Sequence, residues 1–169
     1  MVHNYQQKYE NVLIKQISED DLEHLRVWRN DSQNTKYLRR IPYITSDMQR
    51  SWFQSYLVNK DEMIFVIEET EVINGVVGSM SLYNFVDGVA EFGKFLIGEP
   101  NAHGKSVGVN ALEALKAVAR DKLNLIKLYL HVYSDNEVAI KVYKDAGFDI
   151  TNRRVTKSGL DEYTMEVQL

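Results

Sequence analysis

The chain has 169 residues, of which 44% are hydrophobic and 26% are charged, and its formal net charge at pH 7 is −4. This composition is typical of one soluble globular domain that is long enough to bury a hydrophobic core. The acidic balance excludes wholesale binding of nucleic acid, because the arginine pairs at 39–40 and 153–154 are local exceptions. The absence of cysteine excludes disulfides, thiolate metal ligands and a thiol nucleophile.

No linker, repeat or low-complexity tract divides the chain, so residues 1–169 are predicted to form a single domain. The segment from Met1 to Lys8 is polar and lacks the apolar stretch of a signal peptide. No apolar run approaches the length of a membrane span. We therefore expect a cytoplasmic protein without membrane partners, either a monomer or a homodimer.

The first third of the chain predicts one strand and two helices. Residues 11–17 have the pattern of a strand. Ser18 can cap a helix that runs to Trp28, because acidic side chains fill its first turn. Thr45 can cap a second helix with apolar residues at helical spacing. Trp28 and Trp52 are expected to lie in the core, since both fall on the apolar faces of these helices.

The rest of the chain alternates strands and helices. The predicted elements are an antiparallel meander (63–68, 76–83, 90–97), a helix (107–122), a strand (126–133), a helix (137–146) and a hairpin (148–155, 163–167). Along the single strand, the alternation puts Ile126, Leu128, Leu130 and Val132 on one face. Gly147 can end the helix before it in a left-handed conformation. This order predicts an α+β domain with a mixed sheet.

Two segments carry the chemistry. Residues 97–108 read IGEPNAHGKSVG, and this turn can present free backbone N–H groups at a helix N-terminus, where an anion binds well. Further along, Asn136, Ala139, Ile140 and Tyr143 lie on one face of a short helix. The two segments together indicate a phosphate-bearing cofactor with a phenol beside it.

The predicted order is a strand, a phosphate turn, a helix and a strand, followed by Asn-x-x-Ala-Ile-x-x-Tyr and Gly-Phe. This order resembles the GCN5-related N-acetyltransferase (GNAT) superfamily. The likeness is strongest over residues 90–148. It implies a single-domain α+β fold whose central mixed, mostly antiparallel sheet is flanked by helices. Residues 21–30 and 49–53 resemble the branch of ribosomal-protein N-terminal, spermidine and nucleotide-amino-sugar (pseudaminic-acid pathway) acetyltransferases.

The resemblance implies that acetyl-CoA is the acetyl donor. The implied contacts with it are Phe95, Leu96, Ile97, His103, Gly104, Lys105, Ser106, Val107, Gly108, Asn136, Ala139 and Lys141. The family has Arg or Gln at the position of His103 and Gly at that of Ser106, and the serine matters if the backbone there needs a positive φ. Gly93 and Gly98 can allow a bulge and a close approach in the strand before the turn.

The resemblance also implies the catalytic groups. Tyr143 corresponds to the general acid that protonates the CoA thiolate, although its neighbours also suit a core tyrosine. Glu91 corresponds to a carboxylate that accepts the proton of the amine, although a lone Glu on a strand is commonly solvated or paired. His131, on a predicted strand, is expected to be structural, and no metal site is predicted.

The acceptor wall is expected at the first two helices and the loop between them. Its candidate residues are Trp28, Arg29, Asn30, Tyr83 and Asn84, of which Arg29 could pair with a diphosphate. We expect direct transfer of acetyl to a primary amine in a ternary complex, with a nucleotide-linked 4-amino-dideoxy sugar as the first acceptor. A polyamine such as spermidine and a protein N-terminus are the alternatives, and a non-catalytic sensor of acyl-CoA is the alternative of another class.

Overall fold

The computed structural model describes residues 1–38 and 41–169, so the arginine pair Arg39 and Arg40 lies outside the described part of the chain. The strands are β1 (Gln6–Tyr9), β2 (Val12–Gln16), β3 (Glu62–Glu69), β4 (Gly75–Val86), β5 (Val89–Ile97), β6 (Lys127–Tyr133), β7 (Asp149–Val155) and β8 (Asp161–Gln168). The α-helices are α1 (Leu22–Asn30), α2 (Ser46–Val58), α3 (Val107–Asp121) and α4 (Glu137–Asp145). Over these described ranges, no helix combines the length and the apolar character needed to cross a lipid bilayer.

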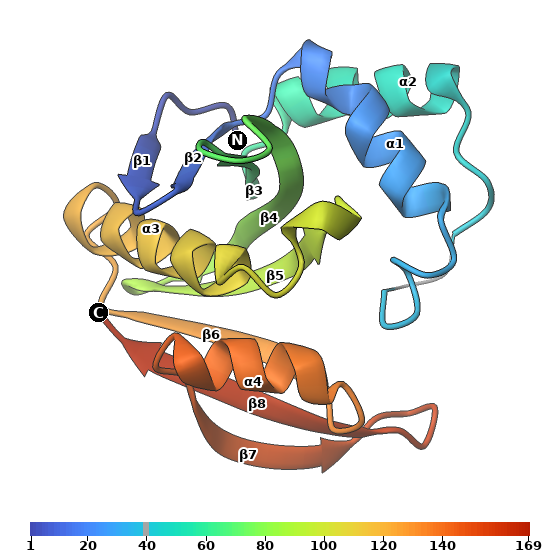
Figure 1. The fold of residues 1–169 in the computed structure, drawn as a ribbon. Coiled ribbons are helices and arrows are strands. Elements are labelled where there is room, and N and C mark those ends of the chain that lie inside the picture. Colours follow the sequence, from blue (N-terminus) through green and yellow to red (C-terminus); the bar gives the residue numbers. More distant parts are fainter. Residues whose placement is uncertain (39–40) are drawn as a thin grey trace.

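The described strands form one sheet with the order β1-β2-β3-β4-β5-β6-β8-β7 (Figure 1). Neighbouring strands pair antiparallel except β5 and β6, which run parallel. The predicted α+β fold with a mixed, mostly antiparallel sheet is therefore confirmed. The predicted strands, helices and terminal hairpin are all present, with their ends shifted by a few residues at most.

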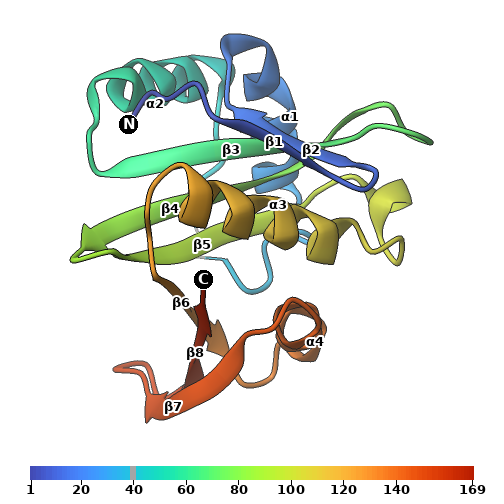
Figure 2. The same ribbon diagram turned by 90° about the vertical axis from the view of Figure 1, so that its left-hand side faces the viewer.

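Helices cover both faces of the sheet, and this explains the continuous apolar run in β3. Phe65 and Ile67 pack in the core that contains the buried side of α3. Ile64 and Val66, which point the other way, pack with α1 and α2. Figure 2 shows α1 and α2 together at the top of the molecule, apart from α3 and α4. A strand buried on both faces has no polar side to display.

Strands β5 and β6 separate shortly after they begin. Their ladder has three residue pairs and ends where Glu91 faces Tyr129, although β5 continues to Ile97 and β6 to Tyr133. Figure 1 shows the two strands running apart beyond this point, which we call the fork. The side of β5 that faces the fork therefore keeps backbone groups that no neighbouring strand pairs with.

A bulge bends β5 just beyond the fork. Ser79 and Ser81 of β4 pair with Leu96 and Gly93, so β5 carries one extra residue in this stretch. Lys94 lies in it with a φ of 51°. A side chain at Gly93 would overlap with the hydroxyl of Tyr83, and one at Gly98 with the ring of Trp28. The predicted bulge is confirmed, whereas the predicted close approach of this strand to the cofactor stays a prediction.

The predicted helix ends are also confirmed. The Asp21 carboxylate accepts hydrogen bonds from the backbone N–H and the hydroxyl of Ser18, each at 2.7 Å. Thr45 Oγ1 accepts one from the N–H of Met48 at the start of α2. Gly147, after α4, has a φ of 87°. These local signals set the helix boundaries without help from the tertiary structure.

Two expected core residues are exposed. Ile126 is 62% exposed because β6 begins after it, and it lies beside the turn at Gly88 instead of under a helix. Trp52 is 38% exposed because α2 buries the face that carries Phe53 and Tyr56. The expectation that Trp52 belongs to the core is therefore wrong, whereas Trp28 is buried as expected.

Strand β1 was not predicted from the sequence. Its residues, Gln-Gln-Lys-Tyr, are mostly polar and exposed, because the strand lies at the edge of the sheet and pairs with β2 alone. Such a strand gains its stability from the backbone ladder, so it leaves little hydrophobic pattern in the sequence.

Candidate active site

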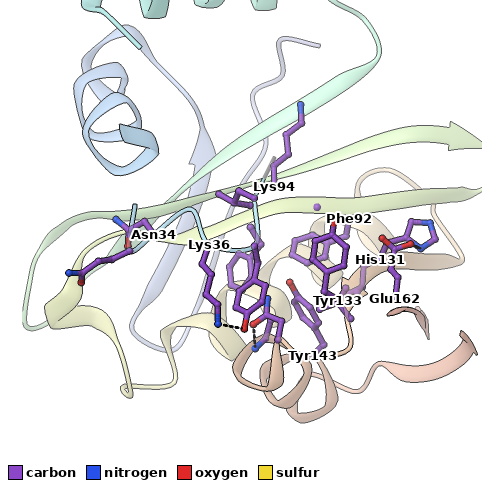
Figure 3. Close-up of a pocket in the computed structure, with 17 residues that line it drawn as sticks. Asn34, Lys36, Phe92, Lys94, His131, Tyr133, Tyr143 and Glu162 are labelled. Carbon is purple, nitrogen blue, oxygen red and sulfur yellow. Dashed lines mark hydrogen bonds and ion pairs between the residues drawn. The ribbon is translucent and has the colours of Figure 1, made fainter. Parts of the chain in front are cut away.

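A cavity of about 380 Å³ lies in the fork. Its walls are residues 92–95 of β5, residues 130–133 of β6, two residues of α4 with its cap Asn136, Glu162 of β8, and five residues between 33 and 38 in the loop after α1. Figure 3 shows Tyr143 and Phe92 near its centre, Asn34 and Lys36 on one side, and His131 with Glu162 on the other. The separation of two parallel strands therefore creates a site with walls from five parts of the chain.

Tyr143 is a buried phenol that faces this cavity. It is 8% exposed, and its ring lies 5.9 Å from that of Phe92 and 6.2 Å from those of Phe95 and Phe148. Burial raises the pKa of its hydroxyl well above the ordinary value for tyrosine, since the phenolate would lose its hydration. Both predicted readings hold for its position, because the ring is part of the core and the residue lines the cavity. At neutral pH the group carries a proton that it can donate.

The turn before α3 forms an uncapped helix N-terminus. Gly104 has a φ of 73° and Ser106 a φ of 57°, and α3 begins at Val107 with no side chain capping it. The first helical backbone bond runs from the N–H of Asn110 to the carbonyl of Ser106. The N–H groups before Asn110 are therefore free to bind an anion, and the helix dipole favours one there.

Ser106 occupies a conformation that favours glycine. A left-handed backbone costs a residue with a side chain roughly 1–2 kcal/mol relative to its usual region. Serine in place of the family's glycine therefore strains the turn, although the backbone at Ser106 still adopts the left-handed conformation. At the other departure from the family pattern, His103 Nε2 lies 2.9 Å from the carbonyl oxygen of Ile97 and ties the turn to β5.

Of four further residues predicted to contact the cofactor, Asn136 and Ala139 line the cavity, whereas Gly108 and Lys141 do not. Gly108 lets α3 approach α4, because a side chain there would lie 3.2 Å from Val142. Asn136 caps α4 through the N–H of Ala139, and both residues line the cavity. Lys141 points to solvent, where its ammonium lies 2.6 Å from Asp145. Lys141 is not among the residues that line the cavity.

Glu91 lies at the fork with three hydrogen-bond donors around it. The hydroxyls of Tyr83 and Tyr129 donate to its carboxylate at 3.2 Å each, and the Asn84 amide donates at 2.7 Å. A second bulge, at Asn84 with a φ of 52°, turns this amide toward Glu91. Burial and the nearby Glu91 charge raise the pKa of both tyrosines. Tyr83 and Asn84, predicted as acceptor residues, contact Glu91 instead of lining the cavity.

The predicted acceptor residues of α1 lie outside the cavity wall. The Asn30 amide donates to the carbonyl of Ile44 at 2.9 Å and accepts from its N–H at 2.8 Å, which braces the loop between α1 and α2. Trp28 is buried against Gly98. Arg29 is half-buried, and this burial lowers the pKa of its guanidinium. Their roles toward an acceptor stay predictions.

Several cavity residues were not selected from the sequence. They are Lys36 and Tyr37 in the loop after α1, Lys94 at the β5 bulge, His131 and Tyr133 on β6, and Glu162 on β8. Tyr37 donates to the carbonyl of Asp135 at 2.9 Å and thereby joins the loop to the start of α4. No local pattern marks these residues, since they meet only when the loop, the bulge and the terminal hairpin come together.

Comparison with known proteins agrees with this geometry. Residues 11–149 match the family model described as the acetyltransferase (GNAT) domain. The spermidine N(1)-acetyltransferase of Escherichia coli K12 is 27% identical over 140 residues, which cover 83% of this chain and 74% of that protein.

Two solved structures share the fold. The spermidine N-acetyltransferase of Vibrio cholerae, in complex with CoA and spermine, aligns with a TM-score of 0.81 and 22% identity over 94% of this chain and 95% of that chain. A GNAT-family acetyltransferase from Bacillus anthracis aligns with a TM-score of 0.81 and 18% identity over 97% of this chain and 98% of that chain.

Proposed function

This chain belongs to the GNAT family of acetyl-CoA-dependent N-acetyltransferases, and we propose that the amine it acetylates is that of a nucleotide-linked 4-amino sugar. The observation that carries this proposal is the charge of the cavity wall. Lys36 brings a cation to the wall, Lys94 lines it with its ammonium turned to Glu62 at 2.7 Å, and Glu162 is the wall's one carboxylate among the described residues. Arg154 already lies 2.6 Å from that carboxylate.

This balance favours an acceptor that is neutral or anionic over a polycation. Each further ammonium of a polyamine needs a carboxylate that is free to pair with it. A sugar linked to a diphosphate instead gains attraction from lysines. Tyr37 and Tyr133 add hydroxyls and aromatic faces to the same wall, which suit a sugar ring or a base.

The same proposal assigns the contacts with acetyl-CoA. The N–H groups of residues 107–109 would hold the pyrophosphate at the start of α3. The unpaired edge of β5 at Phe95, Leu96 and Ile97 would pair with the pantetheine amides. Asn136 and Ala139 would line the other side of the pantetheine. The helix N-terminus offers its N–H groups without a side-chain cap, whereas at the strand edge the carbonyl of Ile97 already lies 2.9 Å from Nε2 of His103.

Tyr143 is the proposed proton donor to the sulfur that leaves. Its hydroxyl has no hydrogen-bond partner among the described residues, and its raised pKa keeps the proton in place until a stronger base forms nearby. Glu91 is the predicted acceptor of the amine's proton. Its position outside the cavity wall and its three donors favour a supporting role, in which it joins β4, β5 and β6 at the fork.

A second acceptor class has a specific observation in its favour. Relatives that align over most of this chain are named spermidine N(1)-acetyltransferases. The carboxylate of Glu62, near the fork, could also pair with an ammonium, although Lys94 already lies 2.7 Å from it. Spermidine is therefore the alternative that the experiment must include.

The test measures release of the CoA thiol from acetyl-CoA with UDP- and TDP-linked 4-amino sugars, spermidine, spermine and peptides with free N-termini. We expect saturable release with the nucleotide sugars. In Lys36→Met, the KM for that sugar should rise several-fold while the KM for acetyl-CoA stays unchanged. Lys122→Met, an exposed lysine after α3, is the matched control. Release with spermidine alone would overturn the sugar proposal, and acetyl-CoA binding without release from any amine would indicate a sensor.

A further inference from the structure

We propose that His131, oriented by Glu162, accepts the proton that the acceptor amine must lose. This inference rests on the transfer of acetyl to an amine and not on which amine is used. It changes the expectation that His131 is structural and that Glu91 is the base. The position of His131, the orientation of its ring and its place in the wall of the cavity support this role.

His131 stands beside the fork on the face of β6 away from the core. Leu128, Leu130 and Val132 are buried, so the alternation of the strand turns His131 to the opposite face. The parallel ladder ends at Glu91 and Tyr129, two residues before His131. Continued in register, the residue across the fork would be Gly93, which has no side chain. The hydroxyl of Tyr83 fills the room above Gly93, so the open space beside the imidazole is the cavity that Gly93 and His131 both line.

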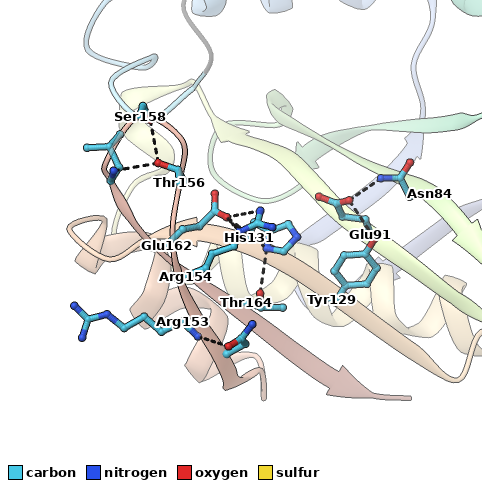
Figure 4. A network of polar contacts seen from close by, with 12 residues as sticks. Asn84, Glu91, Tyr129, His131, Arg153, Arg154, Thr156, Ser158, Glu162 and Thr164 are labelled. Carbon is cyan, nitrogen blue, oxygen red and sulfur yellow. Dashed lines mark hydrogen bonds and ion pairs between the residues drawn. The ribbon is translucent and has the colours of Figure 1, made fainter.

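Contacts from the hairpin fix the imidazole ring. Its Nδ1 lies 3.2 Å from Thr164 Oγ1 and 3.8 Å from a carboxylate oxygen of Glu162. Arg154 holds that carboxylate from β7 at 2.6 Å (Figure 4). The proposal requires the tautomer with the proton on Nδ1, so that Thr164 Oγ1 accepts it; the negative charge of Glu162 favours this tautomer, although 3.8 Å is too long for a hydrogen bond. That tautomer leaves the lone pair on Nε2, and Nε2 has no partner in the described part of the chain.

The charged and titratable groups around the ring come from three strands. Glu162 and Arg154 form a pair on β8 and β7, so the net charge next to His131 is small. On β6 itself, the Tyr129 ring meets the imidazole edge to face at 5.8 Å, and its hydroxyl is turned to Glu91. Figure 4 shows His131 between the Glu162–Arg154 pair and the Glu91 cluster. Glu162 stabilises an imidazolium, and Arg154 moderates that effect.

The cavity brings this base and the proposed acid together. His131, Glu162 and Tyr143 all line it, whereas Glu91 does not. Figure 3 places His131 and Tyr143 on different parts of the wall with Phe92 between them. An amine that enters the cavity can therefore meet a proton acceptor on one side and a proton donor on the other.

The protons balance over one turnover. The acceptor enters as an ammonium with three protons and leaves as an amide with one. His131 Nε2 takes the first proton from the ammonium, and this frees the lone pair of the amine nitrogen to form the C–N bond. The imidazole later releases that proton to water. As the C–S bond breaks, Tyr143 gives its proton to the sulfur. The second proton lost from the nitrogen restores the phenol.

The kinetic test compares His131→Gln and Glu91→Gln through the pH dependence of kcat, with the best amine of the panel at saturation. A base must be unprotonated to accept the amine's proton, so the wild-type rate should fall on the acid side of its pH profile. His131→Gln should lower kcat by about 10²- to 10⁴-fold and lose this acid limb. Glu91→Gln should keep the limb. Loss of the acid limb in Glu91→Gln, together with its persistence in His131→Gln, would overturn the proposal.

Two further readouts separate a base from a structural residue. Imidazole added to His131→Ala should restore part of the rate, which a purely structural histidine would not allow. The ¹⁵N shifts of the wild-type histidines, with His131 assigned by its absence in His131→Gln, should report a proton on Nδ1. A proton on Nε2 at neutral pH would overturn the proposal without any measurement of turnover. Turnover of spermidine in place of the sugars would overturn the proposed acceptor only, since the pH profile is then measured with spermidine.

Discussion

The surroundings of Tyr143 keep its hydroxyl protonated. Three phenylalanine rings surround the side chain, and the hydroxyl faces the cavity. Because this burial raises its pKa, ionisation of the phenol should not limit the rate at any pH below about 10, the ordinary value for tyrosine. The residue is suited to donate a proton and not to act as a phenolate base.

Replacement of Tyr143 by Phe removes the proton and keeps the ring. We expect kcat to fall by about 10²- to 10⁴-fold, the usual contribution of a positioned acid, because the aromatic packing is preserved. The dissociation constant for acetyl-CoA, measured by calorimetry, should change little. Tyr9→Phe, at an exposed tyrosine on β1, is the matched control. Equal rates in wild type and Tyr143→Phe would remove Tyr143 from the mechanism.

At the scale of the element, the start of α3 depends on one residue. The N–H groups that can bind phosphate are positioned by the left-handed backbone at Ser106. Any L-residue there is strained, and a β-branched residue is strained most. The stability of the turn and the affinity for acetyl-CoA should therefore change together when this residue is replaced.

The pair Ser106→Gly and Ser106→Val tests this dependence. Val should destabilise the protein further, because a β-branched side chain adds to the strain that Ser106 already carries. Each kcal/mol lost lowers Tm by about 2–4 °C for a chain of this size. Val should also raise the KM for acetyl-CoA, because the N–H groups move. Gly should leave both quantities equal to or better than wild type. A valine variant with wild-type Tm and KM would show that the turn tolerates the substitution.

At the scale of the whole molecule, Glu69 joins parts of the chain that are far apart. Its buried carboxylate accepts hydrogen bonds from the N–H groups of residues 71–73 and from the Asn11 amide. Asn110 of α3 donates to Asn11 in turn. These donors lower the pKa of Glu69 to about 2. The carboxylate therefore ties the β3–β4 turn to the β1–β2 turn and, through Asn11, to α3.

The stability of the protein should depend on pH through this residue. Its pKa is about 2 when folded and near its ordinary value of 4.5 when unfolded, so its contribution is present above pH 4.5 and is lost as pH falls toward 2. Glu69→Gln should have a lower Tm than wild type at pH 7. The difference should shrink between pH 4.5 and 2. A constant difference in Tm over this range would mean that ionisation of Glu69 does not stabilise the fold.

The sequence alone determined the family and the predicted helices and strands, with β1 as the exception. Caps at Ser18 and Thr45, the alternation along β6 and the turn before α3 are local patterns, because each depends on residues within a few positions of one another. Motif positions such as Asn136 and Tyr143 are local as well, since one helix carries both. The fold and half of the proposed chemistry were predictable for this reason.

The tertiary structure alone decided the walls of the cavity. Tyr37 and Asp135 are 98 residues apart in sequence, and His131 and Thr164 are 33 apart, yet each pair is in contact. The separation of β5 and β6 determines that His131 lines the cavity and that Glu91 remains among its three donors. Periodicity and spacing describe one element at a time, whereas the position of a side chain relative to a distant one depends on how the strands diverge and which loops close over them.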